Sequence, residues 1–202
     1  MNRFAQTLRP ALPRRNALPQ VQPQSDACAT IREEMPQDFL AREALLDRSF
    51  GAGRWRKTCE RLRENRLPAE GLAFTAEENG ALVGTLRFWS IRAGDAHDAL
   101  LLGPIAIDPC LRSRGLGGRM IRHGLHRARE LGHGAVLLVG DAPYYERFGF
   151  ARDLALGLDL PGPVDLARFL ALELRPGALA GARGLVRPTG EHALEAERLR
   201  AA

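Results

Sequence analysis

The chain has 202 residues, of which 45% are hydrophobic and 26% are charged, a composition typical of one soluble globular domain. It has no apolar run long enough to span a bilayer, and no apolar segment of the kind that predicts a secretory signal follows the first basic residues. The three cysteines lack C-x-x-C spacing, so neither a disulfide framework nor a cysteine zinc site is expected. We therefore expect a cytoplasmic protein with no membrane partner.

The formal net charge of +5 lies mostly at one end of the chain. Residues 1–25 contain four arginines, four prolines and no acidic residue, whereas the remaining residues are almost neutral in sum. Prolines oppose a regular helix and few apolar residues are present to anchor this segment, which predicts a flexible N-terminal extension. Because the rest of the chain has no basic stripe, we expect no nucleic-acid partner. The predicted division is 1–25 as the extension, 26–190 as the folded domain and 191–202 as a polar C-terminal end.

From residue 28 onward, the hydrophobic pattern alternates between strands and helices. Pro36 opens the first helix at a position where a missing N–H is tolerated, and Asn79-Gly80 supplies the positive φ angles of a tight turn between two strands. The order of elements predicts a single α/β (α+β) domain around a mixed sheet, with residues 181–202 as a loop and a polar end. In chain order, the expected elements are a strand over 28–35, helices over 36–50 and 55–65, strands over 71–78, 81–93 and 99–107, a helix over 115–132, a strand over 135–140, a short helix over 142–149, and strands over 150–158 and 168–179.

The strand predicted over 99–107 is interrupted by Gly103-Pro104. Proline has no N–H to give to a neighbouring strand, so we expect pairing to break there and the strand to splay from its neighbour. The backbone groups left unpaired are those that an extended, amide-containing ligand would pair with, as in strand addition. Pantetheine, which ends in a pyrophosphate when it is part of coenzyme A, is such a ligand.

A glycine-rich turn follows this strand and opens a helix. Its pattern, Arg-x-x-Gly-x-Gly, also occurs at 48–53 and 129–134, but only the copy at 112–117 leaves a strand and enters a helix. The first turn of a helix has unpaired N–H groups that attract phosphate, and glycines let the backbone approach a pyrophosphate closely. The turn is therefore a candidate anion site; the alternative is an ordinary glycine-rich connection beside a solvated basic helix.

These segments carry a family resemblance. IAIDPCLRSRGLGGRMI (105–121) resembles the acetyl-CoA motif of the GCN5-related N-acetyltransferase (GNAT) superfamily, and YYERFGF (144–150) resembles its later Tyr-x-x-x-Gly-Phe helix and strand. The resemblance covers about residues 28 to 190 and is strongest to the bacterial "predicted N-acetyltransferase" branch. It implies a mostly antiparallel central sheet with a splayed cofactor strand and flanking helices. It also implies acetyl-CoA as the co-substrate.

The resemblance assigns roles to individual residues. Tyr145 occupies the position of a general acid for the departing thiolate, and a phenol with an ordinary pKa of about 10 keeps its proton at neutral pH. The alternative is that the two tyrosines only pack beside Phe148, and we interpret Tyr144 in that way. Asp141 stands where many members have asparagine near the pantetheine, so its side-chain contact stays open. The implied cofactor-binding residues are Ile105, Ala106, Ile107, Arg112, Ser113, Arg114, Gly115, Leu116, Gly117, Gly118 and Asp141.

The sequence does not identify a general base or a metal site. No carboxylate lies between Ala99 and Ile107, where some members keep a base for the attacking amine. His123 and His126 lie three residues apart on an Arg-rich helix without a carboxylate or cysteine to complete a ligand set, so no metal is expected. Six carboxylates are candidate bases by location only, and we interpret each of them rather as a solvated surface charge: Glu33, Glu34, Glu77, Glu78, Asp95 and Asp98.

The sequence thus predicts an acetyl-CoA-dependent N-acetyltransferase that moves an acetyl group directly to a primary amine. One alternative is a non-catalytic module that binds or senses acyl-CoA. A third interpretation, a protein that binds nucleic acid through its Arg-rich N-terminal segment, predicts salt-sensitive DNA binding that is lost when residues 1–25 are deleted. By resemblance, the acceptor pocket is built by residues 38–67 and the late strands. The expected partner is a small-molecule amine or a peptide, and the expected assembly is a monomer or a homodimer.

Overall fold

A computed structural model describes residues 29–194 of the chain. The flexible extension predicted over 1–25 lies outside the described residues, as does the 195–202 part of the predicted polar end. The strands are β1 (Thr30–Glu33), β2 (Ala73–Glu78), β3 (Ala81–Ala93), β4 (His97–Ile107), β5 (Ala135–Val139), β6 (Leu158–Asp159), β7 (Phe169–Glu173), β8 (Gly184–Leu185) and β9 (Arg187–Pro188). The α-helices are α1 (Phe39–Phe50), α2 (Leu116–Glu130) and α3 (Ala142–Glu146), and the 3-10 segments are η1 (Pro36–Asp38), η2 (Ala52–Arg56), η3 (Thr58–Leu62), η4 (Pro109–Leu111), η5 (Asp153–Ala155) and η6 (Leu166–Arg168).

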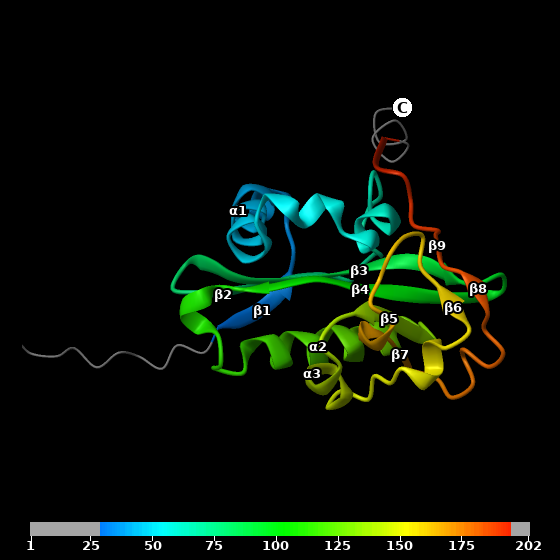
Figure 1. The fold of residues 1–202 in the computed structure, drawn as a ribbon. Coiled ribbons are helices and arrows are strands. Elements are labelled where there is room, and N and C mark those ends of the chain that lie inside the picture. Colours follow the sequence, from blue (N-terminus) through cyan, green and yellow to red (C-terminus); the bar gives the residue numbers. More distant parts are fainter. Residues whose placement is uncertain (1–28, 195–202) are drawn as a thin grey trace, which may run out of the picture.

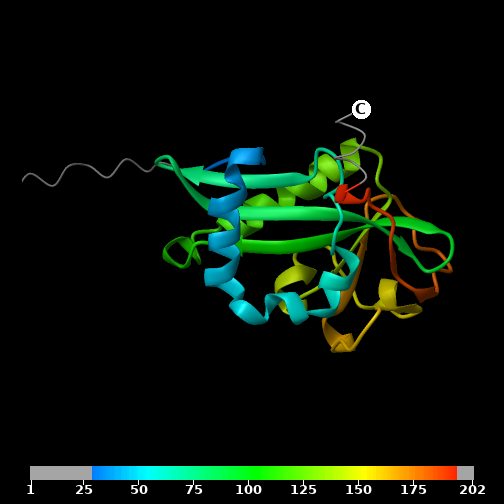
Figure 2. The same cartoon turned by 90° about the horizontal axis from the view of Figure 1, so that it is seen from above.

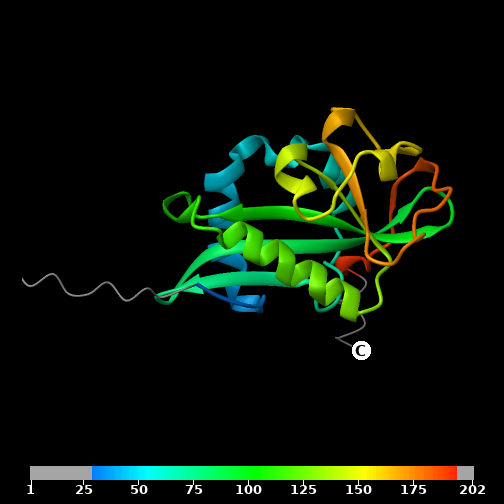
Figure 3. The same cartoon turned by 90° about the horizontal axis from the view of Figure 1, so that it is seen from below.

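A seven-stranded sheet of order β1-β2-β3-β4-β5-β7, with β9 paired to β3, forms the centre of the described part. All of its pairs are antiparallel except β4–β5, which is parallel. Helix α1 and the segments η2 and η3 cover one face, whereas α2 and α3 lie on the other (Figure 1). The view from above shows α1 crossing the strands, and the view from below shows α2 lying across the opposite face (Figures 2 and 3). The predicted mixed, mostly antiparallel fold is confirmed.

The predicted hairpin between β2 and β3 is also confirmed. Asn79 and Gly80 form its turn with φ angles of 53° and 76°. Positive φ at both central positions gives the turn a twist that matches that of the strands, which is why Asn-Gly is favoured there.

The central strands bury side chains on both faces, so their middle parts carry apolar residues at successive positions. On β4, Leu100 and Leu102 join the core beneath α2, whereas Leu101 joins the core on the other face with Trp89 and Val186. This alternation follows from the two-residue period of a strand. The predicted apolar face of α2 is buried in the first of these cores, through Leu116, Met120, Ile121, Leu125 and Ala128.

The break predicted at Gly103-Pro104 is confirmed and opens the sheet between β4 and β5. These strands pair only where Leu100 and Leu101 face Val136 and Leu137. Beyond that point β5 keeps its pairing with β7, and β4 keeps its pairing with β3 past an irregularity between Leu86 and Phe88. The backbone edge of β4 from residue 102 to 107 therefore has no strand partner on the β5 side.

The helix predicted over 55–65 is wrong. The chain forms the 3-10 segments η2 and η3 instead, separated by Lys57, whose extended backbone has a ψ angle of 141°. Trp55, Cys59 and Leu62 have the spacing of one helical face, but Trp55 is 57% exposed whereas Leu62 is fully buried. The three residues are therefore not packed on the sheet as one face, and packing of an apolar face is what stabilises a short helix.

The strands predicted near residues 150–179 are too long. Over 150–158, the only strand pairing apart from β6 is one bridge between Ala151 and Ala171. The strand predicted over 168–179 ends at Glu173, whose carboxylate accepts backbone hydrogen bonds at 2.8 Å from Gly177 and Leu179. Those two bonds hold a turn and so prevent the chain from continuing as a strand.

The loop predicted from residue 181 contains the short strands β8 and β9. Val186 between them is fully buried, and its contacts with the core fix this segment beside β3 and β6. The domain boundary at 190/191 stays a prediction, and 191–193 is tied to the domain because Leu67 donates to the Glu191 carbonyl at 2.9 Å. Within residues 29–194, no helix combines the length and the hydropathy required to cross a membrane.

Candidate active site

Two cavities lie where β4 and β5 diverge. The larger has a volume of about 630 Å³ and the smaller about 220 Å³. Phe50, Ile105 and Tyr144 line both, so the two cavities adjoin along the free edge of β4. A ligand could therefore run from one into the other.

The smaller cavity brings together five of the residues predicted to bind the cofactor. It lies between the end of α1, the second half of β4 and the first turn of α2, and Tyr144 closes one side. The predicted residues that line it are Ile105, Ala106, Ile107, Arg112 and Gly117. Ala106 is also packed against Leu45 and Leu46 of α1, and this contact buries most of its surface.

The predicted turn between the strand and α2 has the backbone that an anion site needs. Ser113 and Gly115 have φ angles of 65° and 79°, and α2 begins directly afterwards at Leu116. A Cβ added at Gly115 would meet nothing within 4 Å, and one added at Gly117 would lie 3.1 Å from the Tyr144 hydroxyl oxygen. The turn thus leaves room for a pyrophosphate beside the first N–H groups of a helix.

Other predicted residues of the turn lie outside this cavity. Ser113, Arg114 and Gly115 are exposed, and Arg114 is 3.8 Å from the Glu78 carboxylate. The side chain of Leu116 is buried in the core, so only its backbone N–H can serve an anion. Gly118 is buried as well, and a Cβ there would be 3.6 Å from Phe148.

Tyr145 and Asp141 line the larger cavity, on the side of α3. Tyr145 is 9% exposed, and burial, followed by the neighbouring Tyr144 phenol, raises its pKa to about 12. The phenol therefore stays protonated at neutral pH, which a proton donor requires. Asp141 precedes α3, is exposed and makes no capping hydrogen bond. Tyr144, interpreted from sequence as a packing residue, lines both cavities and stacks edge-on to Tyr145 at 5.1 Å.

Two residues of the site were missed by sequence reasoning. Gly140 lies directly against the Tyr145 ring, because a Cβ there would be 2.1 Å from Cε2 of Tyr145. Ser49 in the last turn of α1 lines the smaller cavity, and its buried hydroxyl has no hydrogen-bond partner in the described part of the chain. For Gly140 the sequence has only a weak signal, a glycine at the end of a strand. Nothing in the sequence indicated Ser49.

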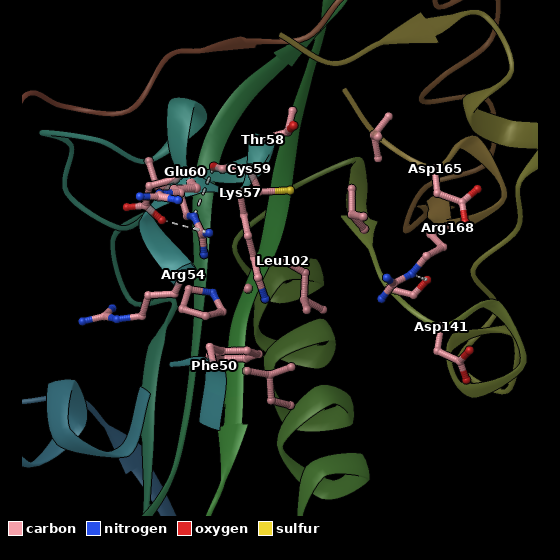
Figure 4. A pocket seen from close by; sticks show the side chains of 18 of the residues that line it. Phe50, Arg54, Lys57, Thr58, Cys59, Glu60, Leu102, Asp141, Asp165 and Arg168 are labelled. Atoms are coloured by element: carbon pink, nitrogen blue, oxygen red, sulfur yellow. Dashed lines mark hydrogen bonds and ion pairs between the residues drawn. The ribbon is translucent and has the colours of Figure 1, made fainter. Parts of the chain in front are cut away.

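The larger cavity has charged side chains on two facing sides (Figure 4). One side is the predicted acceptor segment, now seen as the end of α1 with η2 and η3, and the other runs from the end of β5 to η6. Some charges are already paired: Arg54 with Glu43 and Asp47, and Arg63 with Glu60. The labelled charged residues are Arg54, Lys57 and Glu60 on the first side and Asp141, Asp165 and Arg168 on the second.

None of the carboxylates considered as bases lines either cavity. Glu34 bridges the buried Arg42 and Arg87 by short ion pairs, and Glu77 lies 3.3 Å from Arg32. These contacts give both acids a structural role. Among the described residues, no cluster of three or more histidine, cysteine or acidic side chains could hold a metal ion.

The chain matches the family model described as "Acetyltransferase (GNAT) family" over residues 32–150. This match contains β2 to β5, the glycine turn and both tyrosines. The chain therefore belongs to the GNAT family, its class of reaction is acyl transfer, and the resemblance noted in the sequence is confirmed.

Among individual relatives, the chain is 33% identical over 157 residues to the Escherichia coli (strain K12) protein named "Uncharacterized N-acetyltransferase YhbS", covering 77% of this chain and 93% of that protein. The crystal structure of YhbS from Escherichia coli in complex with CoA superposes with a TM-score of 0.69 at 32% identity, covering 80% of this chain and 89% of that one. A GNAT family acetyltransferase from Brucella melitensis, in complex with acetyl-CoA, superposes with a TM-score of 0.58 at 28% identity, covering 74% and 90%.

Proposed function

We propose that the protein transfers an acetyl group from acetyl-CoA directly to a primary amine. The observation that carries this proposal is the free edge of β4, which has the glycine turn at one end and Tyr145 at the other. One extended ligand with a pyrophosphate at one end and a thioester at the other suits that arrangement. The two solved relatives bound to CoA and to acetyl-CoA support this donor.

In this proposal the smaller cavity holds the donor. The N–H groups from Arg112 to Gly118 bind the pyrophosphate, and the backbone of Ile105 and Ile107 pairs with the pantetheine arm, as a neighbouring strand would. A strand N–H near Ile105 stabilises the oxyanion that forms when the amine attacks. Asp141, which lines the larger cavity, faces the arm in this proposal.

The larger cavity holds the acceptor, a small-molecule amine or a peptide. The direct mechanism brings the amine and the thioester together in one site and needs no nucleophilic cysteine. Burial raises the pKa of the Cys59 thiol, so the cysteine lining this cavity is kept as the unreactive thiol. Tyr145 donates its phenolic proton toward the sulfur as the CoA thiolate leaves.

The test is to incubate the full chain with acetyl-CoA and a panel of primary amines and to measure release of the free thiol. Amine-dependent release, with the acetylated amine identified by mass spectrometry, is expected. If the protein binds CoA in calorimetry but no amine increases thiol release, it is the non-catalytic acyl-CoA-binding module instead. Sedimentation of the same sample decides between the predicted monomer and homodimer.

A further inference from the structure

The chain contains one lysine, Lys57, and its side chain lies in the wall of the larger cavity. We propose that Lys57 is itself an acceptor and that the protein acetylates this amine within its own chain. The inference rests on the proposed function, because it needs a bound acetyl donor. It adds a modification site at a named residue.

The fold holds the backbone of Lys57 in one place. Lys57 lies between η2 and η3, where its N–H donates to the Arg54 carbonyl at 3.4 Å and its own carbonyl accepts from Glu60 at 2.8 Å. From this point the side chain extends into the cavity toward Leu102 of β4 (Figure 4). The amine is thus directed at the strand where β4 and β5 part.

The end of the side chain lies next to the boundary between the two cavities. Nζ of Lys57 is 4.4 Å from the ring centroid of Phe50, and Phe50 lines both the acceptor cavity and the cofactor cavity. An amine at this boundary is close to the place where the proposed donor exposes its thioester. The lysine side chain has a flexible four-carbon stem, so rotation about its bonds moves the amine without movement of the backbone.

The chemistry of the cavity wall singles out Lys57. Arg54 and Arg63 are held in ion pairs with acidic neighbours. A guanidinium group also keeps its proton at neutral pH, so it has no free lone pair with which to attack a thioester. Among residues 29–194, no carboxylate lies within ion-pair distance of Lys57, whose ammonium group lies over the face of the Phe50 ring. No ion pair must therefore be broken before the amine loses its proton and attacks.

The reaction balances without a further reagent. The lone pair of the neutral Lys57 amine attacks the thioester carbonyl carbon, the N–C bond forms and the C–S bond breaks. One proton passes in sum from the amine to the leaving sulfur, which gives acetyl-Lys57 and free CoA. Acetylation converts the charged amine of Lys57 into a neutral amide, so the modified protein has one positive charge fewer beside Phe50 in the acceptor cavity.

The test uses acetyl-CoA labelled with ¹³C in its acetyl group, so that acetylation acquired during expression is distinguished by mass. The full chain is incubated with this donor, and intact mass followed by peptide mapping separates Lys57 from the α-amino group. We expect one labelled acetyl group on Lys57, at a rate independent of protein concentration. That rate should exceed by about 10²-fold the rate for a free peptide of sequence 52–62, because the folded site holds both reactants together.

Two variants serve as controls. Lys57→Arg keeps the charge and should take up no label in this peptide, whereas Gly117→Val fills the cofactor cavity and should lower labelling to the rate of the free peptide. The inference is overturned if free amines are acetylated while Lys57 stays unlabelled, a result that leaves the proposed function intact. It is also overturned if labelling rises with protein concentration or is unchanged in Gly117→Val. If neither Lys57 nor any free amine is acetylated, the proposed function fails together with it.

Discussion

Gly140 and Tyr145 are fitted to each other at the end of β5. A Cβ atom on Gly140 would lie 2.1 Å from Cε2 of the Tyr145 ring, closer than non-bonded carbons can approach. Gly140 cannot move away easily, because its N–H donates to the Arg168 carbonyl at 2.9 Å. The absence of a side chain at 140 is therefore what allows the Tyr145 phenol to lie between the core and the larger cavity.

We expect Gly140→Ala to displace the Tyr145 ring. An added methyl group that cannot be accommodated costs about 1–3 kcal/mol of unfolding free energy, and turnover should fall because the phenol leaves its position. Urea denaturation and thiol-release kinetics measure the two effects. Gly53→Ala is the matched control, since a Cβ at Gly53 would meet nothing within 4 Å. Unchanged stability and turnover in Gly140→Ala would contradict the fit described above.

Tyr145→Phe should separate chemistry from binding. The variant keeps the ring, which packs against Tyr144 and Phe150, and loses the phenolic proton. We expect kcat to fall about 10²–10⁴-fold, the range for loss of a general acid, while CoA affinity and melting temperature change little. Tyr144→Phe is the control and should keep most of the turnover. The opposite ranking of the two variants would assign the proton to Tyr144.

The alkaline limb of the stability profile should also depend on Tyr145. Burial and the Tyr144 phenol raise the pKa of Tyr145 to about 12 in the folded chain, whereas an unfolded tyrosine has a pKa of about 10. As the pH rises, the unfolded chain loses this proton before the folded chain does. The stability contributed by the protonated Tyr145 phenol is therefore complete below a pH of about 10 and is lost between about pH 10 and 12. In Tyr145→Phe, which has no phenol to titrate, the unfolding free energy should fall by up to about 3 kcal/mol less over this pH range than in the parent. Denaturation at several pH values measures the difference. Parallel profiles for parent and variant would show that the phenol is not buried as described.

Sequence reasoning located the elements that a strong local signal defines. The apolar face of α2, the Asn79-Gly80 turn and the break at Gly103-Pro104 each follow from short-range chemistry, and the structure has all three. Segments whose conformation depends on distant contacts were predicted poorly. The stretch 181–190 looked like a loop because contacts with remote strands fix it: the burial of Val186 and the pairing of β8 with β6 and of β9 with β3.

The candidate site divides in the same way. The glycine turn could be predicted because its residues are contiguous and its backbone requirements are visible in the sequence. Gly140 and Ser49 could not, because their importance comes from what lies opposite them in the fold: the Tyr145 ring in one case and the edge of β4 in the other. The segment predicted to bind the acceptor lines the larger cavity, and its role stays a prediction. Its conformation was predicted wrongly, since two 3-10 segments replace the expected helix.

Gly117→Val should abolish CoA binding with little loss of stability. The first atom of the new side chain would lie 3.1 Å from the Tyr144 hydroxyl, and its branches would fill part of the 220 Å³ cavity. We expect calorimetry to detect no CoA binding, while the melting temperature of the unliganded protein stays within a few degrees of the parent. Gly53→Val, at an open surface position, is the control and should bind CoA normally. Parent-like CoA affinity in Gly117→Val would show that the turn is not the pyrophosphate site.

Ser49 offers a test of the cofactor cavity that does not alter its shape greatly. Its hydroxyl is buried in the wall of the smaller cavity and makes no hydrogen bond with any residue from 29 to 194. A buried polar group without a partner is costly to the fold, and a ligand with amide groups can supply the partner. We therefore infer that the hydroxyl bonds the pantetheine arm when the donor is bound.

The expected effect of Ser49→Ala has opposite signs for binding and for folding. Loss of one hydrogen bond should weaken CoA binding by about 1 kcal/mol, which is close to fivefold in Kd. The unfolding free energy of the unliganded protein should stay the same or rise, because alanine leaves no buried hydroxyl unpaired. Ser90→Ala on β3, away from both cavities, is the matched control and should leave CoA affinity unchanged. If Ser49→Ala instead lowers stability and leaves the Kd for CoA unchanged, the hydroxyl serves the fold and the pantetheine arm does not pass beside α1.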